Sequence, residues 1–329
     1  MMKAVMYHYV RKGSSDLGNF FHLDQEDFER QLDYLGKEYG FLSQEDFLKA
    51  LAEKKPANGV LLTFDDGLKE HHDVVLPILK RKGLWGFFFV STAPYETGKL
   101  LNVHRIHMLL GKYDPKEMLR ALKENLQNLD LSYDEIASFK KGTYKSQESG
   151  EEATEFKRIV NYYLGDDVRT SVLDKLMEQY FGKESDLAAE FYLTGKEIKS
   201  LASSGMFVGS HTHTHPVMSK LNRDQQAQEL GRSFSILENF GLSQPERFYC
   251  HPYGHEETYN EQTKDILNKL DVKNAFAVKP KDITAEDLDQ NYLCLPRYDC
   301  NMFPHGKASK GLQRAKQSED LSSSERRML

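Results

Sequence analysis

Short apolar segments recur along this chain, and most are separated by amphipathic helical patterns. Segments with the length and composition of buried strands span residues 3–7, 59–64, 85–90, 206–209, 248–250, 274–278 and 292–295. Helical patterns with start and stop signals cover residues 24–40, 72–83, 194–205, 222–241 and 256–270. Strands that alternate with crossover helices form a parallel sheet, which is either closed into a barrel or left open.

Polar residues suited to catalysis follow several of these strands, and this favours the barrel. They are His8, Asp65 with Asp66, Ser91, His211 with His215, Tyr253 and Arg297. Barrel sites are assembled from the carboxyl ends of many strands, whereas an open sheet concentrates its chemistry at one switch point.

The alternation stops between residues 97 and 190, where Lys, Glu and Leu dominate and no strand is evident. We therefore predict a barrel built from residues 1–96 and 191–305, and a mostly helical insertion at 97–190. Residues 141–152 are the expected mobile loop of the insertion, and residues 306–329 form a polar tail.

Composition indicates a globular enzyme. The 329 residues are 39% hydrophobic and carry a net charge of -6, which argues against general binding of nucleic acid. No window approaches the roughly 20 apolar residues of a transmembrane span. The first residues enter a strand-like run without a secretory signal, and the three cysteines, expected to be structural, include no Cys-x-x-Cys pair. These features predict a cytoplasmic protein.

Adjacent carboxylates follow one of the predicted strands, in Thr63-Phe64-Asp65-Asp66-Gly67. Two like charges this close shift each other's pKa apart, so one carboxylate is free to bind a cation while the other handles protons. Taken alone, the Asp-Gly pair also fits an ordinary turn.

A second polar cluster, His211-Thr212-His213-Thr214-His215, follows another predicted strand. His211 and His215 can turn toward Asp66, since both clusters lie at the same end of the barrel. Two imidazoles and a carboxylate are the protein ligands of many catalytic sites for divalent metals, of which zinc is our first choice. His213 is expected to point elsewhere or to make a supporting contact. The alternative is a chance cluster in a surface loop.

These two clusters and Pro252-Tyr253-Gly254 resemble, in order and spacing, the signature motifs of the polysaccharide deacetylase family, carbohydrate esterase family 4, also called the NodB homology domain. The resemblance covers most of the chain outside the insertion. It implies a distorted (β/α)7 barrel that uses a divalent metal to hydrolyse N-acetyl groups on sugars. It also implies that Asp65 is the general base, that Asp66, His211 and His215 are the metal ligands, and that the Tyr253 N–H donates to the oxyanion.

The chain departs from the family pattern before Pro252-Tyr253-Gly254, where the Arg that steadies the base is absent. Arg297, in Leu295-Pro296-Arg297-Tyr298, is our candidate to supply the missing charge. The alternative for Arg297 is a surface salt bridge.

The chain also lacks the Leu-x-His motif near its C-terminus, which in the family carries the histidine that protonates the leaving amine. Some relatives look circularly permuted, with that histidine on the first strand, and His8 matches this placement. We expect His8 to be the general acid, with His251 as the reserve candidate.

The predicted activity is therefore deacetylation of an acetamido sugar, and the predicted location favours a nucleotide- or lipid-linked form of it. One alternative is hydrolysis of another amide, such as a cyclic imide or ureide. Another is a catalytically silent carbohydrate-binding protein, which the absent motif Arg would suit.

In the insertion, His104-Arg105-Ile106-His107 is either a substrate contact or an exposed helix face. The sequence does not indicate an oligomeric state.

Overall fold

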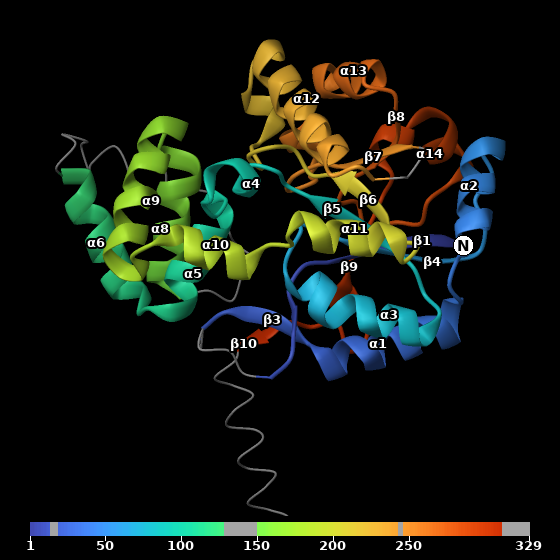
Figure 1. Cartoon of the computed structure of the whole chain (residues 1–329), viewed down its shortest axis with the longest axis horizontal. Helices are drawn as coiled ribbons and strands as arrows, with labels where there is room; N and C mark the ends of the chain where they lie inside the picture. Colours follow the sequence, from blue (N-terminus) through green and yellow to red (C-terminus); the bar gives the residue numbers. More distant parts are fainter. Residues whose placement is uncertain (14–18, 128–149, 243–245, 311–329) are drawn as a thin grey trace, which may run out of the picture. The chain divides into compact units, whose positions relative to one another are not determined.

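The computed structural model describes residues 1–13, 19–127, 150–242 and 246–310, which form two compact units (Figure 1). The first unit comprises Met1–Gly13, His22–Gly98 and Ala188–Ala308. The second contains the described parts of residues 19–21, 99–187 and 309–310. Most of the predicted mobile loop, and residues 311–329 of the predicted tail, lie outside the described residues.

The first unit is built on a seven-stranded parallel sheet with the order β8-β7-β6-β5-β4-β1-β9. Its strands are β1 (Met2–Tyr7), β4 (Gly59–Phe64), β5 (Phe87–Val90), β6 (Phe207–Ser210), β7 (Arg247–Cys250), β8 (Val272–Phe276) and β9 (Tyr298–Asp299). The segment before β9 also reaches the opposite edge, because Leu295 bridges to Phe276 of β8 while Tyr298 pairs with Val5 of β1. The predicted fold, a distorted (β/α)7 barrel, is therefore confirmed.

Helices cover the outside of the barrel. They are α1 (Gln25–Tyr39), α2 (Gln44–Glu53), α3 (Leu76–Lys82), α4 (Pro94–Thr97), α11 (Gly195–Ser203), α12 (Arg223–Asn239), α13 (Glu261–Lys269) and α14 (Ala285–Gln290). A small parallel pair, β2 (Val10–Arg11) and β3 (Phe21–Asp24), precedes α1. The predicted capping box of α11 is confirmed, because Thr194 and Glu197 bond reciprocally.

One predicted strand is wrong. Residues Tyr292–Cys294 form a 3₁₀ turn, and the last strand is the shorter β9 further along the chain. A short apolar run is typical of a strand but also of other buried segments. Here Leu293 and Cys294 are buried in the cluster that contains Ala275 of β8.

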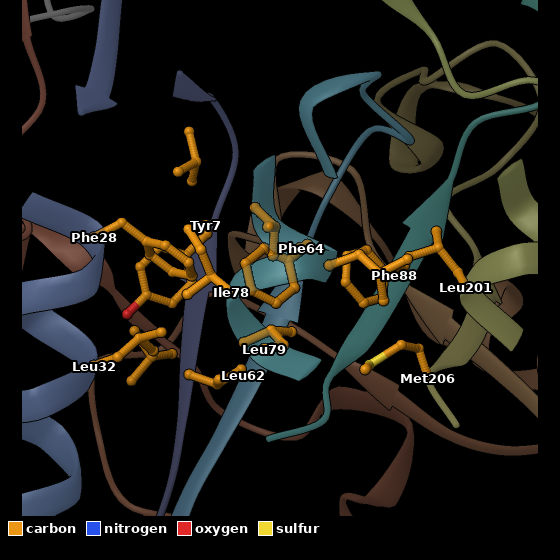
Figure 2. Close-up of a cluster of buried hydrophobic side chains, with 14 of the residues drawn as sticks. Tyr7, Phe28, Leu32, Leu62, Phe64, Ile78, Leu79, Phe88, Leu201 and Met206 are labelled. Carbon is orange, nitrogen blue, oxygen red and sulfur yellow. The ribbon is translucent and has the colours of Figure 1, made fainter. Parts of the chain in front are cut away.

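Side chains alternate between the two faces of the strands, as the pleat requires. The outward residues Tyr7, Leu62, Phe64 and Phe88 pack against α1, α3 and α11, where Phe64 stacks on Tyr7 and Phe88 at ring distances of 5.3 and 4.8 Å (Figure 2). The inward residues form an aromatic interior that includes Phe87, Phe89, Phe248 and Phe276. The same alternation directs the next inward positions, Asp65 after β4 and His211 after β6, toward the carboxyl end of the barrel.

The second unit is helical in its described part. It contains α5 (Asn102–Lys112), α6 (Pro115–Gln127), α8 (Glu151–Arg158) and α9 (Asp166–Phe181), together with the start of α10 (Glu184–Phe191) and the short strand β10 (Ser309–Lys310). Arg105 of α5 is buried and joins this helix to α10 through Glu184 at 2.7 Å and to α9 through Asp174 at 2.8 Å. Its guanidinium is thus engaged inside the unit, so the prediction of an exposed helix face is wrong at this position. Among the described residues, no helix is long and apolar enough to cross a membrane.

We expect Gly209→Ala to destabilise the barrel, because a Cβ at this position would lie 2.6 Å from the ring of Phe89 and 2.7 Å from the Phe248 carbonyl oxygen. Overpacking of this kind costs about 1–3 kcal/mol in the free energy of unfolding, which urea titration measures. Gly231→Ala on α12 is the matched control, since nothing lies within 4 Å of its added Cβ. Equal stability of the two variants would contradict the interior packing described above.

Candidate active site

Strained backbone gathers at the carboxyl end of the barrel. Asp66, Thr212, His215 and Tyr253 all have positive φ, at 80°, 65°, 59° and 61°. Such conformations cost on the order of 1–3 kcal/mol each in non-glycine residues and persist only where the surroundings impose them. Their concentration here indicates a functional site.

Asp66, His211 and His215 meet at this end with their potential ligand atoms within 4.8 Å of one another. Asp66 Oδ1 lies 3.5 Å from His211 Nε2 and 3.6 Å from His215 Nε2. His211 Nδ1–H donates to the Cys250 carbonyl at 2.8 Å, which leaves the Nε2 lone pair facing Asp66. Burial lowers the pKa of His211, against the opposing charges of Asp65 and Asp66, and so favours the neutral imidazole that binds metals.

This donor set fits a divalent cation. Two imidazole nitrogens and one carboxylate oxygen suit zinc and related metals, and they leave a coordination position for water. The structure therefore brings together the three residues that the sequence predicts as metal ligands.

Asp65 points into the barrel and forms a two-pronged ion pair with Arg297. Nη1 and Nη2 of Arg297 donate to Oδ1 and Oδ2 of Asp65, each at 2.8 Å. Burial alone raises the pKa of Asp65, but the charge and hydrogen bonds of Arg297 lower it from 3.8 to about 2. Both side chains are at most 2% exposed, so the alternative of a surface salt bridge is wrong.

Two residues that the sequence analysis did not assign to the site hold Arg297 in place. Its Nη1 also donates to Thr63 Oγ1 at 3.0 Å, and its Nη2 lies 2.9 Å from Cys250 Sγ. The position of Thr63 in the site could have been predicted, since Thr63 lies two residues before Asp65 and so on the same inward face. Cys250 had no such signal, because its side chain meets Asp65 from β7, a strand that is distant in the sequence and does not pair with β4.

His8 and Tyr253 lie at the open side of the site. His8 follows β1, and its Nε2 is 3.9 Å from Asp65 Oδ2, with 41% of the side chain exposed. Tyr253 is 38% exposed, and its ring centroid lies 4.8 Å from that of His215. Both residues are thus open to a molecule that arrives from solvent.

The two remaining histidines of interest point away from the cluster. His213 Nδ1 lies 3.0 Å from Thr92 Oγ1, and its Nε2 lies 3.3 Å from Glu96, which agrees with the supporting contact expected from the sequence. His251 donates from Nε2 to the Leu293 carbonyl at 2.8 Å and stacks on Tyr259. Burial lowers the pKa of His251 to about 3, so it is not a proton donor near neutral pH.

We expect Arg297→Met to destabilise the protein by on the order of 3–5 kcal/mol at pH 7, because it leaves the Asp65 carboxylate buried and unpaired. The pKa of Asp65 is lower in the folded protein than in the unfolded chain, so the stabilisation by the ion pair is present above about pH 4 and is lost as the pH falls toward 2. The difference in unfolding free energy between parent and variant should therefore shrink in acid.

Urea unfolding at several pH values measures this difference. Arg81→Met is the control, since Arg81 pairs with Glu29 while 57% exposed, and loss of such a pair costs no more than about 1 kcal/mol. A pH-independent difference between parent and Arg297→Met would speak against the ionised pair.

The chain is similar to several known deacetylases. The aligned part of a peptidoglycan-N-acetylglucosamine deacetylase from Bacillus cereus is 30% identical over 90 residues, which span 25% of this chain and 30% of that protein. The deacetylase PplD from Streptococcus pyogenes, solved in complex with acetate, has a TM-score of 0.55 at 19% identity, with 91% of each chain covered. A polysaccharide deacetylase from Bacillus cereus has a TM-score of 0.51 at 16% identity, with 96% of this chain and 68% of the other covered.

The structural similarities show a shared fold. The family model described as polysaccharide deacetylase matches residues 52–130 and 167–275, which make up more than half of the chain. Both adjacent carboxylates and the histidine cluster fall within the matched ranges. The chain belongs to the polysaccharide deacetylase family.

Proposed function

We propose that this protein is a metal-dependent hydrolase that removes the N-acetyl group of an acetamido sugar and releases acetate. One observation carries the proposal: a divalent-metal donor set, Asp66 with His211 and His215, lies beside a buried carboxylate, Asp65, that Arg297 keeps ionised. Family membership supports a sugar deacetylase, and the donor set supports the dependence on a metal.

The metal would be held by Asp66, His211 and His215, and zinc is our first choice. When bound, such a cation supplies a water with a pKa of about 7 and polarises the acetamide carbonyl. The Bacillus cereus relative, which is named for peptidoglycan N-acetylglucosamine, makes a 2-acetamido sugar our candidate substrate class.

The residues of the chain divide the proton transfers between them. Asp65 accepts a proton from the attacking water, since a carboxylate has about four acceptor positions, of which Arg297 occupies two and the Cys250 thiol a third. The backbone N–H of Tyr253 donates to the carbonyl oxygen as negative charge grows there. His8, which is open to solvent, gives a proton to the departing amine. The products are acetate and a free amino sugar.

The form of the sugar depends on where the protein acts. The cytoplasmic location predicted from the sequence stays a prediction, and with it the nucleotide- or lipid-linked form of the sugar. Assay of a soluble nucleotide-linked acetamido sugar beside a polymeric one distinguishes a precursor enzyme from one that acts on finished glycan.

The alternatives are separated by their products. Hydrolysis of a cyclic imide or ureide opens a ring and releases no acetate. The silent carbohydrate-binding protein was suggested by the absent motif Arg, and the contact between Arg297 and Asp65 supports catalysis instead.

We expect His211→Ala to lose bound metal, because it removes one of three protein ligands, whereas His213→Ala should retain it. The two variants delete the same side chain two positions apart, and His213 faces Glu96 and Thr92 instead of Asp66. Metal content after zinc loading and desalting, measured by mass spectrometry, checks this. Equal metal content in both variants would contradict the proposal that Asp66, His211 and His215 bind the metal.

We expect Asp65→Asn to lower kcat for acetate release by about 10²–10⁴, the usual contribution of a positioned general base. His8→Ala should lower kcat by a similar factor through loss of the general acid. His72→Ala is the control, since its imidazole contacts Asp73 outside the site. Acetate is measured by a coupled assay, and parental turnover in Asp65→Asn would exclude Asp65 from the mechanism.

A further inference from the structure

We propose that Glu229 on α12 is a positioning residue that holds the loop carrying the two histidine ligands in the shape that binds the metal. The inference rests on the proposed metal-dependent function. It assigns a role to a side chain that contacts none of the reacting atoms and lies 14 positions beyond His215 in the sequence.

Glu229 accepts three hydrogen bonds from the loop between the ligands. Its Oε2 accepts from the backbone N–H of His213 at 3.0 Å and of Thr214 at 2.8 Å, and its Oε1 accepts from Thr214 Oγ1 at 2.7 Å. These donors lie between His211 and His215, so one carboxylate fixes the part of the loop that sets the spacing of both ligands. Hydrogen bonds to an ionised acceptor are about twice as strong as those between neutral groups.

The loop needs such a clamp because its backbone is strained. Thr212 and His215 both have positive φ, and Thr212 is β-branched, which makes that conformation costlier still. Neighbouring groups donate hydrogen bonds to the loop carbonyl oxygens. Ser233 Oγ donates to Thr212 O at 3.0 Å, and the Ala93 N–H donates to His213 O at 2.9 Å. Glu229 is the partner of two successive loop N–H groups.

The helix that carries Glu229 is a firm support. α12 begins at a capping box formed by Asn222 and Gln225, and its Leu230 and Phe234 are buried in the cluster that also contains Tyr249 of β7. Glu229 and Ser233 are four residues apart, so both lie on the helix face that meets the loop. The packing of α12 against the barrel therefore fixes where Glu229 lies, and Glu229 in turn fixes the loop that carries the ligands.

We expect Glu229→Gln to weaken metal binding, because a neutral amide oxygen accepts weaker hydrogen bonds from the His213 and Thr214 N–H groups than a carboxylate oxygen does. Loss of an outer-sphere partner lowers metal affinity by about 10–100-fold. Zinc affinity is measured by competition with a chromophoric chelator, and the visible spectrum of the cobalt-loaded protein reports the ligand geometry. Glu238→Gln, the same change on the same helix, is the control, and its affinity should stay within about twofold of the parent.

Far-UV circular dichroism and thermal unfolding of the metal-free proteins separate loss of the clamp from loss of the fold. Thr214→Val, which removes only the hydroxyl bond to Oε1, should weaken zinc binding by less than Glu229→Gln does. Parental zinc affinity and cobalt spectrum in a folded Glu229→Gln would overturn this inference alone. A parent that binds neither zinc nor cobalt would overturn the proposed function, and this inference with it.

Discussion

The buried ion pair between Asp65 and Arg297 is the interaction on which the site depends. Removing two charges from water is costly, and the cost is offset only when the geometry and the surrounding hydrogen bonds are good. Thr63 and Cys250 provide further contacts to the guanidinium. Arg297 reaches Asp65 because the segment just before β9 joins both edges of the sheet, so closure of the barrel and ionisation of the base are linked.

Adjacent carboxylates at the end of β4 take different roles because the backbone turns between them. Asp65 continues the inward alternation of the strand and meets Arg297, whereas Asp66 adopts a positive φ and faces the imidazoles of His211 and His215. One carboxylate is thereby paired with a fixed cation, and the other is directed to the proposed metal. The strain at Asp66 is thus part of how a single short motif supplies two functions.

Much of the fold was predictable because strand and helix signals are local. The buried strands β4 and β5, the capping box of α11 and the parallel direction of strands joined by crossover helices all follow from patterns within short windows. The segment at Tyr292–Cys294 was mispredicted as a strand because apolar composition alone does not report hydrogen-bond partners. The gathering of Asp66, His211 and His215 was also predictable, since the carboxyl ends of parallel strands meet at one end of the barrel.

The sequence by itself determined the chemistry available to this protein: a carboxylate pair, a histidine pair and a barrel to bring them to one end. Only the tertiary structure decided how those groups are held. The two-pronged geometry between Arg297 and Asp65, the thiol of Cys250 beside both, and the carboxylate of Glu229 under the ligand loop join residues far apart in the chain. Such contacts depend on strand register and on the angle at which a helix packs, and no local pattern encodes either.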